Sequence, residues 1–307
     1  MHKIRFIIPY FGKLRSDFCF WLKSAEHNAS IDFLIFTDQE ICTANKNITV
    51  IKCELPFIEK IAKQKIWECC RINHPYKLCD YKTAYGELFQ DYLQGYDFWG
   101  HCDVDLVFGN IRNYITDDIL DNHDRIGVEG FFTLYRNNTE INHHYWNLGE
   151  DFIKKAFLDD AIYGLDEWGP GGNGGGTSNW WITHRKERLW MDMIFDSLEP
   201  YTYEFITKRA LNDETTNVIF RYNNGTLMRY GLKNGKVTAT ETLLAHVQKR
   251  TITTETLETD KFCIIPPGRY VDYKEVITSN YLRTFTYKAL LYKIKNKILR
   301  IFNHITR

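Results

Sequence analysis

Apolar and polar residues alternate in blocks along the first seventy positions and predict strands separated by helices. Short apolar runs at Ile4–Ile8, Asp32–Thr37 and Ile48–Cys53 end in polar or turn residues, which is typical of buried strands. Two longer stretches, Phe18–His27 and Ile58–Cys70, carry apolar residues at helical spacing. The order of strand, helix and strand with short links predicts a parallel sheet.

Further along the chain the pattern predicts elements of both kinds. Asp80 suits the N-cap of a helix whose apolar stripe runs over Ala84–Leu93, and Tyr96–Cys102 is short and mostly aromatic, which indicates a buried strand. The remaining expected elements are a short helix near Asp117–Leu120, strands at Arg125–Val128 and Phe131–Tyr135, helices over 143–158 and 187–198, hairpins over Val218–Val237, a strand over Leu243–Arg250 and an amphipathic helix over Asn280–Arg307.

Two carboxylates follow the Tyr96–Cys102 strand directly. Asp103 and Asp105 are one residue apart, and in an extended chain such residues point to the same side. Carboxylates this close repel each other unless a cation lies between them, and hard oxygen ligands suit Mg²⁺ or Mn²⁺, which hold substrate phosphates. Because ligands of open α/β sheets bind at the carboxyl ends of strands, the stretch predicts a metal–diphosphate site. An isolated Asp-x-Asp would instead be two solvated loop aspartates.

Three charged residues gather where the helix after Asp80 is expected to begin. Lys77, Asp80 and Lys82 could bind an anion at a helix N-terminus. They could equally form an ordinary cap with solvated lysines, and both interpretations stay open.

Asp166 and Glu167 precede Trp168 and a glycine-rich stretch, Gly169–Gly176. One interpretation is a general base beside an aromatic sugar platform, and the other is a surface turn. The glycines match Gly-x-Gly-x-x-Gly formally. However, no predicted strand precedes them and no Gly-Lys-Ser/Thr occurs, so neither a dinucleotide fingerprint nor a phosphate loop is predicted. We expect a mobile loop at the border of a site.

His246 lies on the strand expected over Leu243–Arg250 and is followed by Lys249 and Arg250. This arrangement offers one metal ligand and two phosphate partners. Taken alone, the segment is better explained as a half-buried histidine with a basic turn.

Composition narrows the class of protein. Lys+Arg and Asp+Glu are both 39, so the chain as a whole has no field that would attract nucleic acid. The eight cysteines form no Cys-x-x-Cys pair and indicate reduced thiols of a cytoplasmic protein. The N-terminal apolar run is too short for a signal peptide, and no stretch approaches the length of a membrane span.

The end of the chain differs in charge from the rest. Residues 276–307 contain seven Lys/Arg and no Asp/Glu, which leaves a net charge of −7 on the other residues. Apolar residues here form one helical stripe: Leu291, Ile294, Ile298, Ile301, Phe302 and Ile305. This composition favours peripheral contact with the anionic inner face of the cell membrane. The alternative is a helix packed on the domain with its lysines in water.

Taken in order, these features resemble nucleotide-sugar glycosyltransferases of the GT-A fold. More narrowly, two motifs are similar to those of a bacterial family encoded with capsule and O-antigen synthesis genes: Lys77-x-Cys79-Asp80-Tyr81-Lys82-x-Ala84-Tyr85-Gly86 and Gly100-His101-Cys102-Asp103-x-Asp105-x-x-Phe108-Gly109. The resemblance, which covers about Ile4–Arg250, implies an α/β fold with a Rossmann-like, mostly parallel central sheet flanked by helices. It implies a GT-A domain over 1–275, with a nucleotide-binding half at 1–110 and an acceptor-side half at 111–275, and a basic helical tail at 276–307.

The resemblance also implies roles for residues. Asp103 and Asp105 would hold Mn²⁺ or Mg²⁺ on the donor diphosphate, with His246 as a third ligand. Asp166 or Glu167 would deprotonate the acceptor hydroxyl if transfer inverts the anomeric centre, which is the favoured outcome. The residues expected to contact the donor are Pro9, Tyr10, Asp38, Lys77, Asp80, Lys82, Asp103, Lys249 and Arg250.

The implied reaction moves a hexosyl residue from a nucleotide sugar, expected to be a UDP sugar, to a growing lipid-linked surface polysaccharide. Two other classes stay open. A metal-dependent nucleotidyl- or phosphotransferase would also use Asp-x-Asp, together with a second acidic metal cluster. A non-catalytic component of a polysaccharide assembly complex would bind the sugar nucleotide without transferring it.

Overall fold

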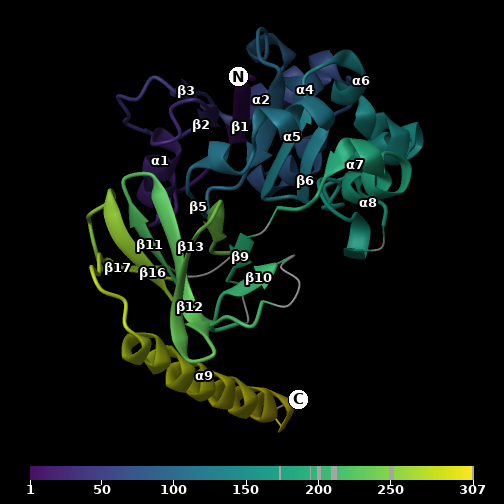
Figure 1. Cartoon of the computed structure of the whole chain (residues 1–307). Helices are drawn as coiled ribbons and strands as arrows, with labels where there is room; N and C mark the ends of the chain where they lie inside the picture. Colours follow the sequence, from purple (N-terminus) through teal and green to yellow (C-terminus); the bar gives the residue numbers. More distant parts are fainter. Residues whose placement is uncertain (173, 194, 199–201, 209–212, 249–251, 306–307) are drawn as a thin grey trace. The chain divides into compact units, whose positions relative to one another are not determined.

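The computed structural model describes residues 1–172, 174–193, 195–198, 202–208, 213–248 and 252–305 (Figure 1). The chain forms two compact units. The first unit comprises Met1–Leu14, Asn28–Asp103 and Ile115–Met193, and the second comprises Arg15–His27, Val104–Tyr114 and Ile194–Arg307. Each unit is discontinuous in sequence, and the linear boundaries expected at residues 110 and 275 stay predictions.

A seven-stranded sheet forms the centre of the first unit. Its strands are β1 (Ile4–Pro9), β2 (Asp32–Thr37), β3 (Ile48–Lys52), β4 (Phe98–Cys102), β6 (Arg125–Glu129), β7 (Phe132–Arg136) and β8 (Leu189–Trp190). They follow the order β3-β2-β1-β4-β7-β6-β8. The first four are mutually parallel, whereas β7 runs antiparallel to both β4 and β6. The expected α/β class with a mostly parallel central sheet is confirmed.

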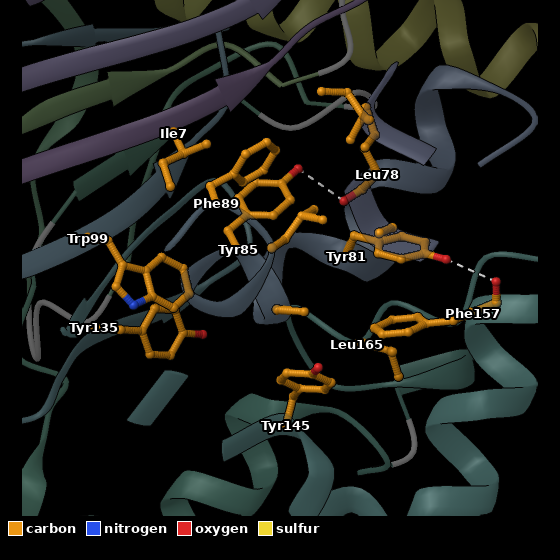
Figure 2. Packing of buried hydrophobic residues seen from close by; sticks show 14 of the residues in the cluster. Ile7, Leu78, Tyr81, Tyr85, Phe89, Trp99, Tyr135, Tyr145, Phe157 and Leu165 are labelled. Atoms are coloured by element: carbon orange, nitrogen blue, oxygen red, sulfur yellow. Dashed lines mark hydrogen bonds between the residues drawn. The ribbon is translucent and has the colours of Figure 1, made fainter. Parts of the chain in front are cut away.

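Short helices accompany this sheet: α2 (Leu55–Lys65), α3 (Leu78–Tyr81), α4 (Tyr85–Leu88), α5 (Asp117–Asn122), α6 (Thr139–Asn142), α7 (Glu150–Leu158) and α8 (Thr177–His184). Many of their apolar residues join one core cluster, which is rich in aromatic side chains. Figure 2 shows part of it, including Tyr85, Trp99 and Tyr135. The Trp99 and Tyr135 rings stack with their centroids 4.5 Å apart, which ties β4 to β7.

The prediction of a single helix over Ala84–Leu93 is wrong. Short helical turns occupy Pro75–Tyr92 instead. Gly86 in this run lies against β4, and a Cβ added there would come within 2.6 Å of the Trp99 ring. The apolar spacing therefore reflects close packing of a compact run of turns, not one amphipathic helix.

Two other expected helices are interrupted or absent. The stretch 143–158 divides into a 3₁₀ turn, His144–Leu148, and α7, because Gly149 between them has φ = 105°. The stretch 187–198 contains β8 rather than a helix, since Leu189 pairs with Arg125 of β6. Tertiary pairing thus overrides the helical spacing of that segment.

The second unit is mainly β-structure. A four-stranded sheet has the order β10-β9-β14-β5, and a six-stranded sheet has the order β13-β12-β11-β16-β17-β15. The elements are α1 (Phe18–Glu26), β5 (Leu106–Phe108), β9 (Phe195–Ser197), β10 (Ile206–Lys208), β11 (Thr216–Asn223), β12 (Thr226–Lys233), β13 (Lys236–Glu241), β14 (Leu244–His246), β15 (Thr253–Thr254), β16 (Lys261–Ile265), β17 (Arg269–Asp272) and α9 (Ser279–Ile305). The hairpins expected over Val218–Val237 are confirmed as β11-β12-β13, whereas β15, β16 and β17 were not predicted.

Helix α9, drawn in yellow in Figure 1, packs its first half on the six-stranded sheet. Leu282, Phe285 and Ala289 are buried together with Ile219 of β11. Thr286 also exchanges hydrogen bonds with Asn217. The alternative of a packed helix therefore holds for this part of the tail. Among the described residues, no helix is long and apolar enough to cross a membrane.

Candidate functional site

The carboxyl ends of β1 and β2 bring together three of the residues expected to contact the donor. Pro9 ends β1 and pairs in register with Phe36 of β2, and the backbone N–H of Tyr10 donates to the Phe36 carbonyl at 2.8 Å. Asp38 follows β2, and its carboxylate accepts a hydrogen bond from the backbone N–H of Gly12 at 2.9 Å. A hydrogen bond from Gln39, with that from Gly12, lowers the pKa of Asp38. An ionised carboxylate is thus held at the edge where α/β sheets bind ligands.

Asp103 lies at the same edge of the sheet, one residue after β4. Its backbone N–H donates to the Phe131 carbonyl at 2.9 Å, which anchors it beside the start of β7. Its Oδ1 accepts a hydrogen bond from the Lys82 ammonium at 2.7 Å, and its side chain is 40% exposed. The carboxylate therefore keeps access to solvent, where a ligand could reach it.

Lys82 joins Asp103 to the acid pair that follows later in the chain. Its Nζ also donates to the Gly130 carbonyl at 2.7 Å and lies 3.3 Å from Asp166 Oδ2. Burial lowers the pKa of Lys82, but Asp103 and Asp166 outweigh this effect and raise it well above the usual value. A permanent cation therefore lies between two carboxylates that are 63 positions apart.

Asp166 has the chemistry expected of a base. Its side chain is buried, and burial raises its pKa to about 6 although Lys82 acts in the opposite direction. Glu167 differs, because its Oε1 accepts a hydrogen bond from the backbone N–H of Gly130 at 2.9 Å. Asp166 thus has the proton affinity suited to exchange near neutral pH.

Lys77 and Asp80 match neither of the two interpretations left open by the sequence. Both side chains are 0% exposed, and Lys77 Nζ lies 2.8 Å from Asp80 Oδ2. They are therefore neither solvated cap residues nor an open anion site at a helix N-terminus. Helix α3, with four residues, is also too short to supply a substantial dipole.

The second unit brings Asp105 and His246 together. His246 Nε2 lies 3.5 Å from Asp105 Oδ1, and the backbone N–H of Val247 donates to the Asp105 carbonyl. On the other side of the ring, Nδ1 lies 3.2 Å from the Ser197 hydroxyl, within hydrogen-bonding distance. Such a contact to the second ring nitrogen is common in histidines that bind metals, because it orients the imidazole.

Arg15 also lies near Asp105, and the sequence did not predict a role for it. It forms a two-pronged ion pair with Asp17, at 2.9 and 3.0 Å, and its guanidinium lies 3.9 Å from Asp105. The only signal in the sequence is an Arg-x-Asp pair in the segment after the first strand, which is too common to single out. Arginine in this position suits recognition of a phosphate.

The second unit offers ligands of the kind that a divalent cation takes. Two atoms each about 2.1 Å from one ion can be at most about 4.2 Å apart, and the Asp105 and His246 atoms satisfy this limit. Within the part of the chain that the structure describes, no cluster of three His, Cys, Asp or Glu side chains is ready to hold a metal. Mg²⁺ is usually held by one or two carboxylates together with substrate phosphates, so Asp105 is a ligand of the kind it takes, whereas the imidazole nitrogen of His246 suits a transition metal better.

Other expected features lie partly outside the described residues. Lys249 and Arg250 are among the residues that the structure does not describe, so their phosphate role stays a prediction.

In the glycine-rich stretch, the backbone of Gly176 lies close to that of Glu167: a Cβ added to Gly176 would come within 2.3 Å of the Glu167 carbonyl oxygen. Glycine is required there for packing behind the acid pair.

A sequence profile described as a family of unknown function, DUF6625, matches residues 6–274. The chain belongs to this family. No curated protein matches this DUF6625 member. Among solved structures, it is similar to the crystal structure of the galactosyltransferase LgtC in complex with donor and acceptor sugar analogues. The two chains are 11% identical, the match covers 63% of this chain and 75% of that one, and the TM-score is 0.36. A likeness of this size carries no argument about the site, so the functional proposal rests on this chain's own residues.

Proposed function

We propose that this DUF6625 member is a metal-dependent glycosyltransferase that uses a nucleotide sugar. One observation carries the proposal: Asp103, at the carboxyl end of a parallel strand, shares the buried Lys82 with Asp166, whose pKa is raised to about 6. Sugar transfer to a hydroxyl with inversion of the anomeric centre needs a site for the leaving diphosphate and a base for the acceptor proton. Asp103 and Asp166 are suited to these two tasks.

The donor side consists of the sheet edge with Pro9, Tyr10 and Asp38, where the base and ribose of a UDP sugar would bind. Asp103 and Asp105 are joined through a single residue, so covalent geometry keeps their Cα atoms within about 7 Å. Together with His246 they would hold Mn²⁺ or Mg²⁺. The bound ion would supply Lewis-acid stabilisation of the leaving diphosphate. Arg15, whose guanidinium lies 3.9 Å from Asp105, would add a phosphate contact.

On the acceptor side, Asp166 would accept the proton of the attacking hydroxyl. Its burial keeps the carboxyl poised between protonated and ionised forms, and Glu167 would bind sugar hydroxyls. This division of roles favours inversion of the anomeric centre, because a retaining enzyme needs no such base. Trp168, at the entrance to the glycine-rich stretch, is 36% exposed and could serve as a sugar platform.

The acceptor in this proposal is a lipid-linked glycan of a bacterial surface polysaccharide, reached at the inner face of the cell membrane. Support comes from α9: Leu290, Leu291 and Ile294 expose 54%, 47% and 47% of their surface. These apolar side chains lie in a segment with seven positive and no negative charges. Such a surface suits anionic lipids.

The deciding experiment is a panel of nucleotide sugars incubated with the purified chain, Mn²⁺ and simple glycoside acceptors. We expect transfer from one donor class, loss of transfer in EDTA, and loss in Asp105→Asn with an unchanged melting temperature. The matched control is Asp272→Asn, an aspartate of the same unit that lies at the end of β17. Full activity in EDTA would contradict the metal. Donor binding without transfer to any acceptor would favour a non-catalytic sugar-nucleotide-binding component.

A further inference from the structure

We infer that Lys77, Asp80 and Lys82 form a clamp that fixes the segment carrying the proposed base, instead of contacting the donor phosphates. The segment in question is 161–167, called the acid segment below. The inference rests on the proposed function only for the importance of Asp166. Its structural part can be tested without any substrate.

Asp80 makes the central contact of the clamp. Its carboxylate accepts hydrogen bonds from the backbone N–H of Tyr163, at 3.0 and 3.1 Å, and from that of Leu165, at 3.4 Å. The carboxylate is fully buried, so these amides and Lys77 replace its hydration. A buried carboxylate with several such donors strongly favours one backbone conformation of the acid segment.

Lys77 makes the second contact, at the start of the acid segment. Its Nζ donates to the Ala161 carbonyl at 2.6 Å and to Asp80 Oδ2 at 2.8 Å, and it lies 5.4 Å from the centre of the Tyr163 ring. The ammonium is fully buried. A phosphate could reach it only if these contacts broke and the ion pair opened, which is costly for buried charges.

Lys82 makes the third contact, at the end of the acid segment. Two of its three donors are used by Asp103 and the Gly130 carbonyl, and Asp166 lies 3.3 Å away. One short run of helical turns thus binds the acid segment at its beginning, middle and end. The spacing Lys-x-x-Asp-x-Lys is explained by this arrangement.

Apolar packing and helix α8 hold the acid segment from other directions. Figure 2 shows Tyr81, which lies between Asp80 and Lys82 in sequence, stacked on Phe157 and donating its hydroxyl hydrogen to the Phe157 carbonyl. Leu165 belongs to the same buried cluster. Thr177 of α8 donates to the Leu165 carbonyl through both its backbone N–H and its hydroxyl. The clamp therefore adds the charged contacts to a segment that is already packed.

The experiment compares Asp80→Asn and Lys77→Met with the parent protein by amide hydrogen exchange across 161–167 and by UDP binding in the presence of Mn²⁺. If the clamp holds, exchange in 161–167 accelerates at least about tenfold in both variants, because local opening becomes easier. The UDP affinity of both variants stays within about twofold of that of the parent protein. Their kcat for transfer falls by a larger factor than their KM for the donor changes. The matched control is Lys154→Met, which removes an exposed ammonium paired with Glu150 on α7 and should change neither readout.

The opposite pattern would overturn the inference: unchanged exchange in 161–167 together with a loss of UDP affinity of tenfold or more, as expected for direct phosphate contacts. Lys77→Met leaves Asp80 with its two backbone donors, so this variant keeps the test decisive if Asp80→Asn does not fold. Absence of UDP binding and of transfer in the parent protein would count against the proposed function. Hydrogen exchange alone would then decide on the clamp.

Discussion

At the scale of single residues, burial decides what each acid can do. Asp38 and Asp103 keep contact with solvent, whereas Asp166 is buried beside Lys82. The sequence predicted a role for Asp103 and Asp105 because they directly follow a recognisable strand, and for His246 because it lies on another expected strand. It could not rank Asp166 above Glu167, since the hydrogen bond from Gly130 to Glu167 depends on a turn far away in sequence.

The raised pKa of Asp166 predicts the pH dependence of transfer. A general base must be ionised, so the rate should rise with pH through about 6 and level off above it. Asp166→Asn should lower kcat by about 10²–10⁴-fold and abolish this limb of the profile, with donor affinity little changed.

The measurement is kcat from pH 5 to 8.5 at saturating donor and Mn²⁺, with Glu167→Gln as the control. If Glu167→Gln removes the limb and Asp166→Asn keeps it, the roles of the two acids are exchanged. Retention of the anomeric configuration in the product, seen by NMR, would exclude a base role for both.

At the scale of elements, strands with clear apolar runs could be predicted, and short turns could not. β2 has the bounds expected, and β11 and β12 follow from the Asn-Gly turns between their apolar runs. The turns over Pro75–Tyr92 could not be predicted, because buried charges and the fit of Gly86 against Trp99 decide their path. β16 and β17 were not predicted: they form a local hairpin with Ile265 opposite Arg269, whereas the pairing of β16 with β11 is long-range.

The turn between β6 and β7 provides a test at this scale. Gly130 contributes both its N–H to Glu167 and its carbonyl to Lys82, and a Cβ there would lie 2.5 Å from Asp166 Oδ2. Gly130→Ala should therefore displace Asp166 and lower kcat by roughly tenfold or more, as small misplacements of reacting groups do.

Gly175→Ala is the matched control, because a Cβ there meets Pro170 at 3.4 Å, an ordinary contact. Circular dichroism and melting temperature check that both variants fold. Equal activity of the two variants would mean that the acid pair does not need this close turn.

At the scale of the whole molecule, the chain crosses repeatedly between two units, one of which contains two sheets of its own. The sequence predicted a domain over 1–275 with two consecutive halves and a tail over 276–307, because linear patterns give only boundaries that are continuous in sequence. α9 illustrates the point: Phe285 and Leu282 look like part of an amphipathic stripe, yet they complete the core over β11 and β12. Only the later part of the helix remains for another role.

Two truncations test how much the packing of α9 contributes to stability. Removal of residues after Ser279 deletes Leu282 and Phe285 from the core and should lower the melting temperature by several degrees or prevent folding, since losing one buried Phe costs about 3–5 kcal/mol. Removal of residues after Tyr292 keeps these side chains and should leave the melting temperature nearly unchanged. A stable protein ending at Ser279 would show that the packing of α9 contributes little.

The later part of α9 carries the prediction of membrane contact. The apolar side chains of Leu290, Leu291 and Ile294 are about half exposed and stand among basic residues, while the rest of the chain has a net charge of −7. Each Lys or Arg close to an anionic leaflet contributes about 1 kcal/mol, which salt screens, and insertion of the apolar side chains adds to this. We therefore expect the chain to sediment with vesicles rich in anionic lipid, and high salt to release part of it.

Leu291→Glu together with Ile294→Glu should abolish sedimentation while transfer to a soluble acceptor continues. The matched control is Leu257→Glu. Leu257 is 96% exposed on a loop of the same unit, so this substitution replaces an exposed apolar side chain by a carboxylate without changing α9. Sedimentation with neutral vesicles to the same extent would remove the electrostatic part of the argument. Unchanged sedimentation of the double variant would exclude this face of α9 as the lipid-binding surface. The two added carboxylates are costly to bury in the acyl region of the membrane, and an anionic leaflet repels them, so either effect should weaken binding.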